Sequence, residues 1–386
     1  MKPLRCMAWA LLLGSLSLAQ AAQEPEVDYL ALATLMLRDG HYDRALVALD
    51  QMDTADETLD RARYYTLRGM AHLRRDELEP ARDALVQAVA ASEANSADAD
   101  STVYIYLAQI HFRLQDYAAT LAALDRAGIV VERIASIYHM RAQCHWLLHD
   151  PVMALATLDQ AAEIFPRDHS FLRRKIFFLI DMGLFQQAVV LGQAYLAATA
   201  GALEDYLALG TALRASGDLD QAAVLLEQAL LHFPDSADAR KVLAHVYIER
   251  GELTAAADLL YIAALLDAAL LGEAAELYRR AGQTQRALWI NGQLTGQTVK
   301  LRQRLAIYLQ LGSFEQVVAM QDALQRIGLL DDEDIRYAIA YALFKTGDFR
   351  AAETQLAALN RPDLFRKAAE LRRAIQDCTD DRWKCL

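Results

Sequence analysis

The chain has 386 residues, and its 51 acidic and 39 basic side chains give a formal net charge of −12 at pH 7. An acidic surface disfavours non-specific binding to nucleic acids and anionic lipids, both of which need a basic surface. Hydrophobic residues make up 54% of the sequence, against only 17 Gly and 7 Pro. This composition is typical of long helices and argues against β folds with many turns and against disorder.

Residues 1–21 are predicted to be a cleaved signal peptide. Lys2 and Arg5 supply positive charge, residues 6–18 are mostly apolar, and residues 19–21 (Ala-Gln-Ala) form a small-residue cleavage site. A transmembrane anchor is the alternative, but the apolar run is shorter than the roughly 18–20 residues that a spanning helix needs. We therefore expect a periplasmic protein that reaches a membrane only through a partner. Loss of Lys2 and Arg5 would lower its formal charge from −12 to −14.

Small or apolar residues then recur at the spacing of a helical repeat. Ten of them mark the middle of the first helix of each predicted hairpin: Ala33, Gly69, Ala108, Ala142, Ile176, Gly210, Ala244, Ala275, Leu305 and Ala340. Twelve residues after each lies a second marker: Ala45, Ala81, Thr120, Ala154, Ala188, Ala222, Ala256, Ala287, Val317 and Ala352. Four consecutive intervals are 34 residues long. Small residues at both markers allow two helices to pack at about 8–10 Å.

Glycine predicts the turn inside most hairpins, because a helix C-terminus favours a residue that is free to adopt positive φ. The turn glycines are Gly40, Gly183, Gly217, Gly251, Gly282, Gly312 and Gly347. The clearest unit begins at Tyr206 and places Gly210, Gly217 and Ala222 at the expected spacing. Pro234 follows and ends its second helix.

This pattern resembles the tetratricopeptide repeat (TPR) family over nearly the whole chain after residue 21. The resemblance implies an all-α, right-handed TPR solenoid of about ten helical hairpins across residues 22–360. The units around residues 275 and 305 are short and poor in consensus residues, so we expect a bend or a weaker joint there. Within residues 361–386, a helix from Asp363 to Gln376 is expected to cap the stack with its polar face.

The first helices of a TPR array line its concave surface, and helical periodicity selects the positions that face it. In the second to fifth units these positions include an apolar strip: Met70, Leu73, Ile105, Phe112, Trp146, Phe177 and Ile180. We predict that the strip binds an extended or helical segment of a protein partner. The alternative is that these side chains pack on one another as core. From the sixth unit onward the same positions are polar and charged.

No residue pattern for catalysis is present, since the sequence lacks HExxH, CxxC, GxSxG and P-loop motifs. His72, His111 and His145 recur at the repeat period. Successive repeats would hold them about 10 Å apart, too far for one metal ion, so a structural role is expected. We therefore predict that the protein is not an enzyme and has no metal site and no cofactor.

Three cysteines follow the predicted signal peptide, and two of them lie close together near the C-terminus. In an oxidising compartment Cys378 and Cys385 are predicted to form a disulfide that pins the tail. Cys144 lies inside a predicted helix and is expected to be a buried thiol.

The C-terminal segments are also similar to TPR proteins associated with TonB energy-transduction systems. The residues that carry this likeness are 335–349, 364–373 and 383–385. The resemblance implies a role as a scaffold, with TonB, ExbB and ExbD-type proteins as partners. Two other functions fit the same surface. One is a TPR scaffold for exopolysaccharide export or outer-membrane protein assembly, and the other is a regulator of a cell-wall hydrolase or synthase.

Overall fold

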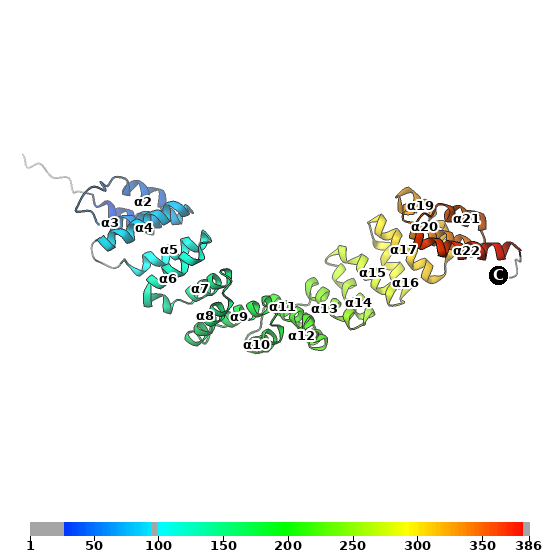
Figure 1. The fold of residues 1–386 in the computed structure, drawn as a ribbon. Coiled ribbons are helices and arrows are strands. Elements are labelled where there is room, and N and C mark those ends of the chain that lie inside the picture. The colour runs from blue at the N-terminus through cyan, green and yellow to red at the C-terminus, as the bar shows by residue number, and fades with distance from the viewer. Residues whose placement is uncertain (1–26, 95–98, 381–386) are drawn as a thin grey trace, which may run out of the picture. The chain divides into compact units, whose positions relative to one another are not determined.

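A computed structural model describes residues 27–94 and 99–380, which fold into helices joined by short connections (Figure 1). No strand occurs in these two ranges. The predicted signal peptide and Cys385 lie outside the described residues. The chain divides into two compact units, Met1–Phe165 and Pro166–Leu386.

The first unit contains four helical hairpins, and a short 3₁₀ helix, η1 (Gly128–Arg133), joins the last two. Its α-helices are α1 (Tyr29–Arg38), α2 (Tyr42–Leu49), α3 (Arg61–Arg74), α4 (Leu78–Ala94), α5 (Ser101–Arg113), α6 (Tyr117–Arg126), α7 (Ala135–Leu147) and α8 (Pro151–Ile164). Each helix packs against the next one along the chain.

The second unit contains six hairpins and a final helix. Its regular hairpins are α9 (Ser170–Asp181) with α10 (Phe185–Ala198), α11 (Leu203–Ala215) with α12 (Leu219–His232), α13 (Ala237–Glu249) with α14 (Leu253–Ala264), and α15 (Leu271–Arg280) with α16 (Thr284–Gln293). The remainder is α17 (Gln297–Leu311), α18 (Phe314–Ala319), α19 (Gln321–Arg326), α20 (Glu333–Lys345), α21 (Phe349–Ala357) and α22 (Pro362–Asp380), with 3₁₀ turns η2 (Ala268–Leu270) and η3 (Leu329–Asp331). The predicted all-α solenoid architecture is confirmed.

The core lies where the two helices of each hairpin meet, and all twenty marker residues named above are buried. Their small size is required where a large neighbour faces them. A Cβ atom at Gly69 would lie 2.5 Å from Leu85 Cγ, and one at Gly210 would lie 2.6 Å from Leu226 Cδ2. Both distances are closer than packed carbon atoms tolerate. The small size of these residues therefore allows the two helices of a hairpin to pack closely.

Residues with positive φ form the turns inside the hairpins, and side-chain hydrogen bonds cap the helices that follow. The seven predicted turn glycines all have positive φ, for example +85° at Gly217. In three hairpins the same conformation is adopted by other residues, Asp76, Gln115 and His149, with φ of 68°, 63° and 59°. An aspartate often begins the next helix: Asp218 Oδ1 accepts a hydrogen bond from the Gln221 N–H at 3.1 Å.

The units around residues 275 and 305, where a bend or a weaker joint is predicted, are joined by a buried polar residue. Asn291 is fully buried in α16, and its amide donates to the Lys300 carbonyl at 2.9 Å while its oxygen accepts from Arg304 Nε at 3.0 Å. These polar contacts add to the apolar packing of Ile290 and Ile307 between α16 and α17. In the ninth hairpin, the second helix is divided at Met320 into α18 and α19.

The capping helix predicted from Asp363 to Gln376 is present as α22, which begins one residue earlier and ends four residues later. Its buried face packs against α20 and α21 and consists of Leu364, Ala368, Leu371, Ile375 and Cys378. Cys378 is disulfide-bonded. Because Cys385 lies outside the described residues, its identity as the partner stays a prediction.

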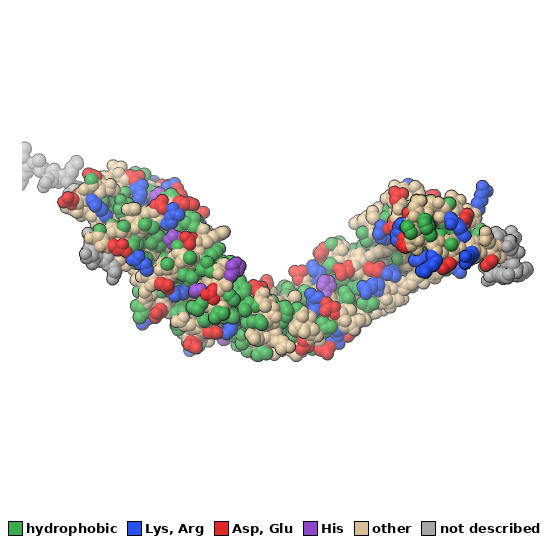
Figure 2. Space-filling view, viewed as in Figure 1, with side chains coloured by type: hydrophobic (Ala, Val, Ile, Leu, Met, Phe, Trp, Pro, Cys, Tyr) green, Lys and Arg blue, Asp and Glu red, His purple; other side chains and the backbone are tan. Residues whose placement is uncertain are grey.

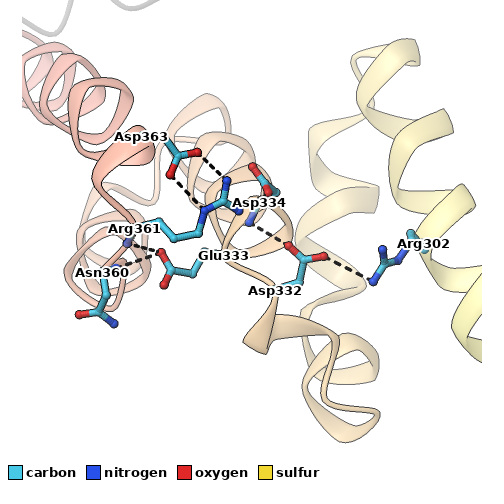
Figure 3. Close-up of polar contacts among 7 residues, drawn as sticks. All are labelled: Arg302, Asp332, Glu333, Asp334, Asn360, Arg361 and Asp363. Carbon is cyan, nitrogen blue, oxygen red and sulfur yellow. Dashed lines mark hydrogen bonds and ion pairs between the residues drawn. The ribbon is translucent and has the colours of Figure 1, made fainter.

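A group of polar contacts fastens the start of α22 (Figure 3). The Glu333 carboxylate accepts hydrogen bonds from the backbone N–H groups of Asn360 and Arg361 at 2.9 and 2.8 Å. The Arg361 guanidinium also pairs with Asp334 and Asp363, each at 2.5 Å. The link between α21 and α22 is therefore tied to the first turn of α20.

Within the described ranges, no helix is both long enough and apolar enough to cross a membrane.

Candidate protein-interaction site

The part of the apolar strip that belongs to the first unit lies on α3, α5 and α7. Each of its side chains is half-buried: Met70, Leu73, Ile105, Phe112 and Trp146. Leu73 and Ile105 pack against the apolar core of the second and third hairpins. The Phe112 ring meets Tyr117 edge-on, with 5.9 Å between ring centroids. Leu73, Ile105 and Phe112 are thus held in place by their neighbours, and all five side chains keep part of their surface in solvent.

A cavity of about 450 Å³ opens beside the strip between α3 and α5. Its lining includes Leu73 of the strip together with Gln109, Arg74 and Arg113. Arg113 forms an ion pair with Asp76. Among the residues that the structure describes, Arg74 makes no ion pair. The strip therefore has a basic edge, although the chain as a whole is acidic.

In the second unit, the strip residues Phe177 and Ile180 are half-buried on α9. Ile180 packs against the apolar core formed by α10 to α13. The Arg173 guanidinium lies over the Phe177 ring, 5.0 Å from its centroid, which is the distance of a cation–π contact. Arg173 thereby covers part of this aromatic surface.

Asp205 holds Arg173 in that position, and it has the highest burial of the acidic side chains in the described ranges, at 3% exposed. Its carboxylate accepts hydrogen bonds from Arg173 Nε at 2.5 Å, from the Ala202 N–H at 2.8 Å and from the Tyr195 hydroxyl at 3.3 Å. These contacts connect α9, the end of α10 and the start of α11. Sequence reasoning missed Asp205. A carboxylate in the first turn of α11 was its only sequence signal.

Farther along the second unit, the charged first-helix positions pair with one another. Arg214 on α11 contacts Glu249 on α13 at 2.6 Å. Arg279 contacts Glu276 on the same helix, also at 2.6 Å. Here much of the charge is neutralised within the protein, unlike the open apolar surface of the strip.

The repeated histidines have structural surroundings. His72 Nδ1 lies 2.6 Å from Glu77 Oε2, which belongs to the turn between α3 and α4. Burial lowers the pKa of His111 below its ordinary value. In a later unit the same position holds Tyr247, which donates to Glu227; burial and then Glu227 raise the pKa of Tyr247 to about 12. Across the described residues, no group of three or more His, Cys, Asp or Glu side chains is placed to hold a metal ion.

The family comparison decides the type of repeat, because residues 213–263 match the tetratricopeptide repeat family. This segment is a TPR segment. It spans α12, α13 and nearly all of α14, and it overlaps the unit whose spacing is clearest in the sequence. The predicted resemblance to the TPR family is confirmed. The link to TonB systems is not shown. No curated protein matches the chain.

Several solved TPR-type structures are similar to the chain at low identity. PilF of Pseudomonas aeruginosa is 14% identical, with a TM-score of 0.39, and the match covers 56% of this chain and 96% of that one. PilW, a type IV pilus biogenesis factor, is 22% identical, with a TM-score of 0.38 and coverage of 50% and 91%. YrrB, a TPR protein with an unusual peptide-binding site, is 17% identical, with a TM-score of 0.38 and coverage of 48% and 93%. These values say nothing about the partner of this chain.

Proposed function

We propose that the protein is a non-enzymatic scaffold that binds a segment of a partner protein through the apolar strip. The TPR segment suggests protein–protein interaction in general. The more specific support is that the strip residues of the first unit are only half-buried on its successive first helices α3, α5 and α7. Apolar side chains that are fixed beneath and open above can gain binding energy at about 25 cal/mol per Å² of surface covered, with little cost for ordering them.

The proposed partner segment carries aliphatic or aromatic side chains and an acidic residue. The apolar side chains would cover Ile105, Phe112 and Trp146. The acidic residue would pair with Arg74, whose guanidinium lines the cavity between α3 and α5. Such a pair would favour correct placement of the segment more than it would raise the affinity, because Arg74 is exposed.

We further propose a periplasmic location and an envelope complex as the partner, with a TonB-type system as the first candidate. The proposal rests on the signal-peptide pattern of residues 1–21 and on the C-terminal similarity described above. Fractionation of cells that express the full chain tests the location. Recovery in the cytoplasm with residues 1–21 intact would contradict it.

Site-specific photocrosslinking in living cells tests the partner and the strip together. A benzoylphenylalanine residue replaces Phe112 in one variant and Val86 in the control. Val86 is 46% exposed on α4, a second helix, and is not part of the strip. We expect Phe112 to capture one dominant protein and Val86 to capture none of it. TonB, ExbB or ExbD peptides in the product would support the TonB candidate, whereas equal capture at both positions would contradict the role of the strip.

A further inference from the structure

A second apolar site lies in the second unit, on a different face of α11 from the predicted concave positions. A cavity of about 550 Å³ opens between the second helices α10 and α12, with α11 beneath it. Its apolar walls include Val189, Leu196, Leu209, Leu213, Val224 and Leu225. Leu209 and Leu213 are separated by one helical turn, and Thr211 and Arg214 lie on another face of the same helix. In the view of Figure 2, hydrophobic side chains gather over this part of the chain.

The cavity coincides with the absence of a leucine that occurs in seven of the ten repeats. Four residues after the second marker, most second helices carry a leucine that is at most 1% exposed: Leu49, Leu85, Leu124, Leu158, Leu226, Leu260 and Leu356. In α10 this position is Gly192. A Cβ there would lie 2.3 Å from Leu209 Cδ2, so Leu209 fills the place next to the backbone of α10. Leu209 therefore takes the space that a larger side chain at position 192 would need, and Leu209 itself forms part of the cavity wall.

The surroundings of the cavity are acidic. From α10 to α12, residues 185–232 contain a single arginine, no lysine and five acidic residues, of which only Asp205 is buried, where it pairs with Arg173. The single arginine, Arg214, is paired with Glu249. At the cavity itself, the Asp220 side chain is 88% exposed and lies 3.5 Å from Arg250. An occupant with basic groups near an apolar anchor would therefore complement this surface, and an acidic one would be repelled.

We propose that this cavity is a second docking site, which receives an apolar anchor from an amphipathic helix of a partner protein with Lys or Arg on its flanks. The volume is within the range of pockets that enclose a ligand group, and an amphipathic helix presents its anchors along one side. The site does not depend on the apolar strip, because its residues lie on second helices and on a different face of α11. A scaffold with both sites can hold two protein segments.

Peptide binding to the purified full chain tests this proposal. The probe is a fluorescent helical peptide with Leu and Trp on one face and Lys on both flanks, and a sister peptide carries Glu in place of Lys. The two matched variants are Val224→Lys and Val190→Lys. Val190 on α10 and Val224 on α12 each lie two residues after the second marker of their hairpin. They are 66% and 54% exposed, but only Val224 lines the cavity. The strip is intact in both variants.

We expect the Lys-flanked peptide to bind and the Glu-flanked peptide to bind at least about tenfold more weakly. Val224→Lys should weaken binding by about tenfold or more, and Val190→Lys by less than about twofold. Absence of binding, equal affinity for the two peptides, or equal loss in both variants would overturn the proposal. Two other results would also overturn it. If sedimentation showed that Val224→Lys dissociates a dimer, the occupant would be a second copy of this chain. If mass spectrometry found a co-purified lipid that only Val224→Lys removes, the occupant would be an acyl chain.

Discussion

Replacement of Asp205 by alanine should locally destabilise the contact among α9, α10 and α11. The substitution removes a carboxylate that is 3% exposed and accepts hydrogen bonds from Arg173, Ala202 and Tyr195. Loss of one partner of a buried ion pair costs about 3–5 kcal/mol. The Arg173 side chain is 40% exposed, so water can solvate it after the change. This lowers the expected cost to about 3 kcal/mol, most of it from the unpaired Ala202 N–H and the lost charge-assisted bond.

Hydrogen exchange followed by mass spectrometry is the suitable assay, because repeat proteins open locally and do not always unfold in one step. Backbone amides of residues 199–213 should lose about 3 kcal/mol of protection in Asp205→Ala. Asp205→Asn, which keeps an acceptor but not the charge, should lose about half of that. Asp220→Ala is the control, since that side chain is 88% exposed, and it should change protection by less than about 0.5 kcal/mol. Equal protection in Asp205→Ala and the control would refute the reasoning.

Three further predictions concern the turns, the buried thiol and the last helix. His149 has φ of +59°, so His149→Gly should raise the free energy of unfolding in urea by about 1 kcal/mol. Gly217→Ala should lower it by a similar amount, because Gly217 has φ of +85°. Opposite signs would contradict the argument that these turns require positive φ. Cys144 is fully buried and burial raises its pKa to about 11, so at pH 8 its thiol should stay unreactive toward a water-soluble disulfide reagent until the protein is denatured. Glu333→Ala should increase hydrogen exchange in α22 but not in α13; unchanged exchange in α22 would show that its attachment does not need Glu333.

The hairpins could be predicted because the signal is a spacing of small residues that packing requires. A residue such as Gly69 or Gly210 has no room for a larger side chain. Close contact between helices therefore requires a small residue at a fixed position, and this can be recognised in the sequence without knowing which residue it contacts. The cap was predictable for a similar reason. The buried face of α22 repeats every three or four residues, and most residues between its members are polar.

Other features depend on contacts that the spacing does not encode. The turns at Gln115 and His149 lack glycine, and only the structure shows that these residues adopt positive φ. Gly192 interrupts the row of buried leucines, but so do Asn291 and Gln321, and the sequence alone does not show which interruption lies beside a cavity. Asp205 shows its role only when Arg173 from another repeat lies beside it. The half-buried state of the strip residues likewise follows from how neighbouring helices pack, and helical periodicity alone could not separate surface from core.

The most direct test of the proposed function is the double substitution Phe112→Ser and Trp146→Ser, with binding and folding measured on the same protein. The partner segment identified by crosslinking at Phe112 is titrated into both proteins by calorimetry, and helix content is followed by circular dichroism during urea unfolding. The half-buried positions of both side chains predict a folded variant with wild-type helix content and an affinity at least about tenfold lower. Loss of helix content without urea would show that the strip is core, and wild-type affinity in a folded variant would show that the partner binds elsewhere.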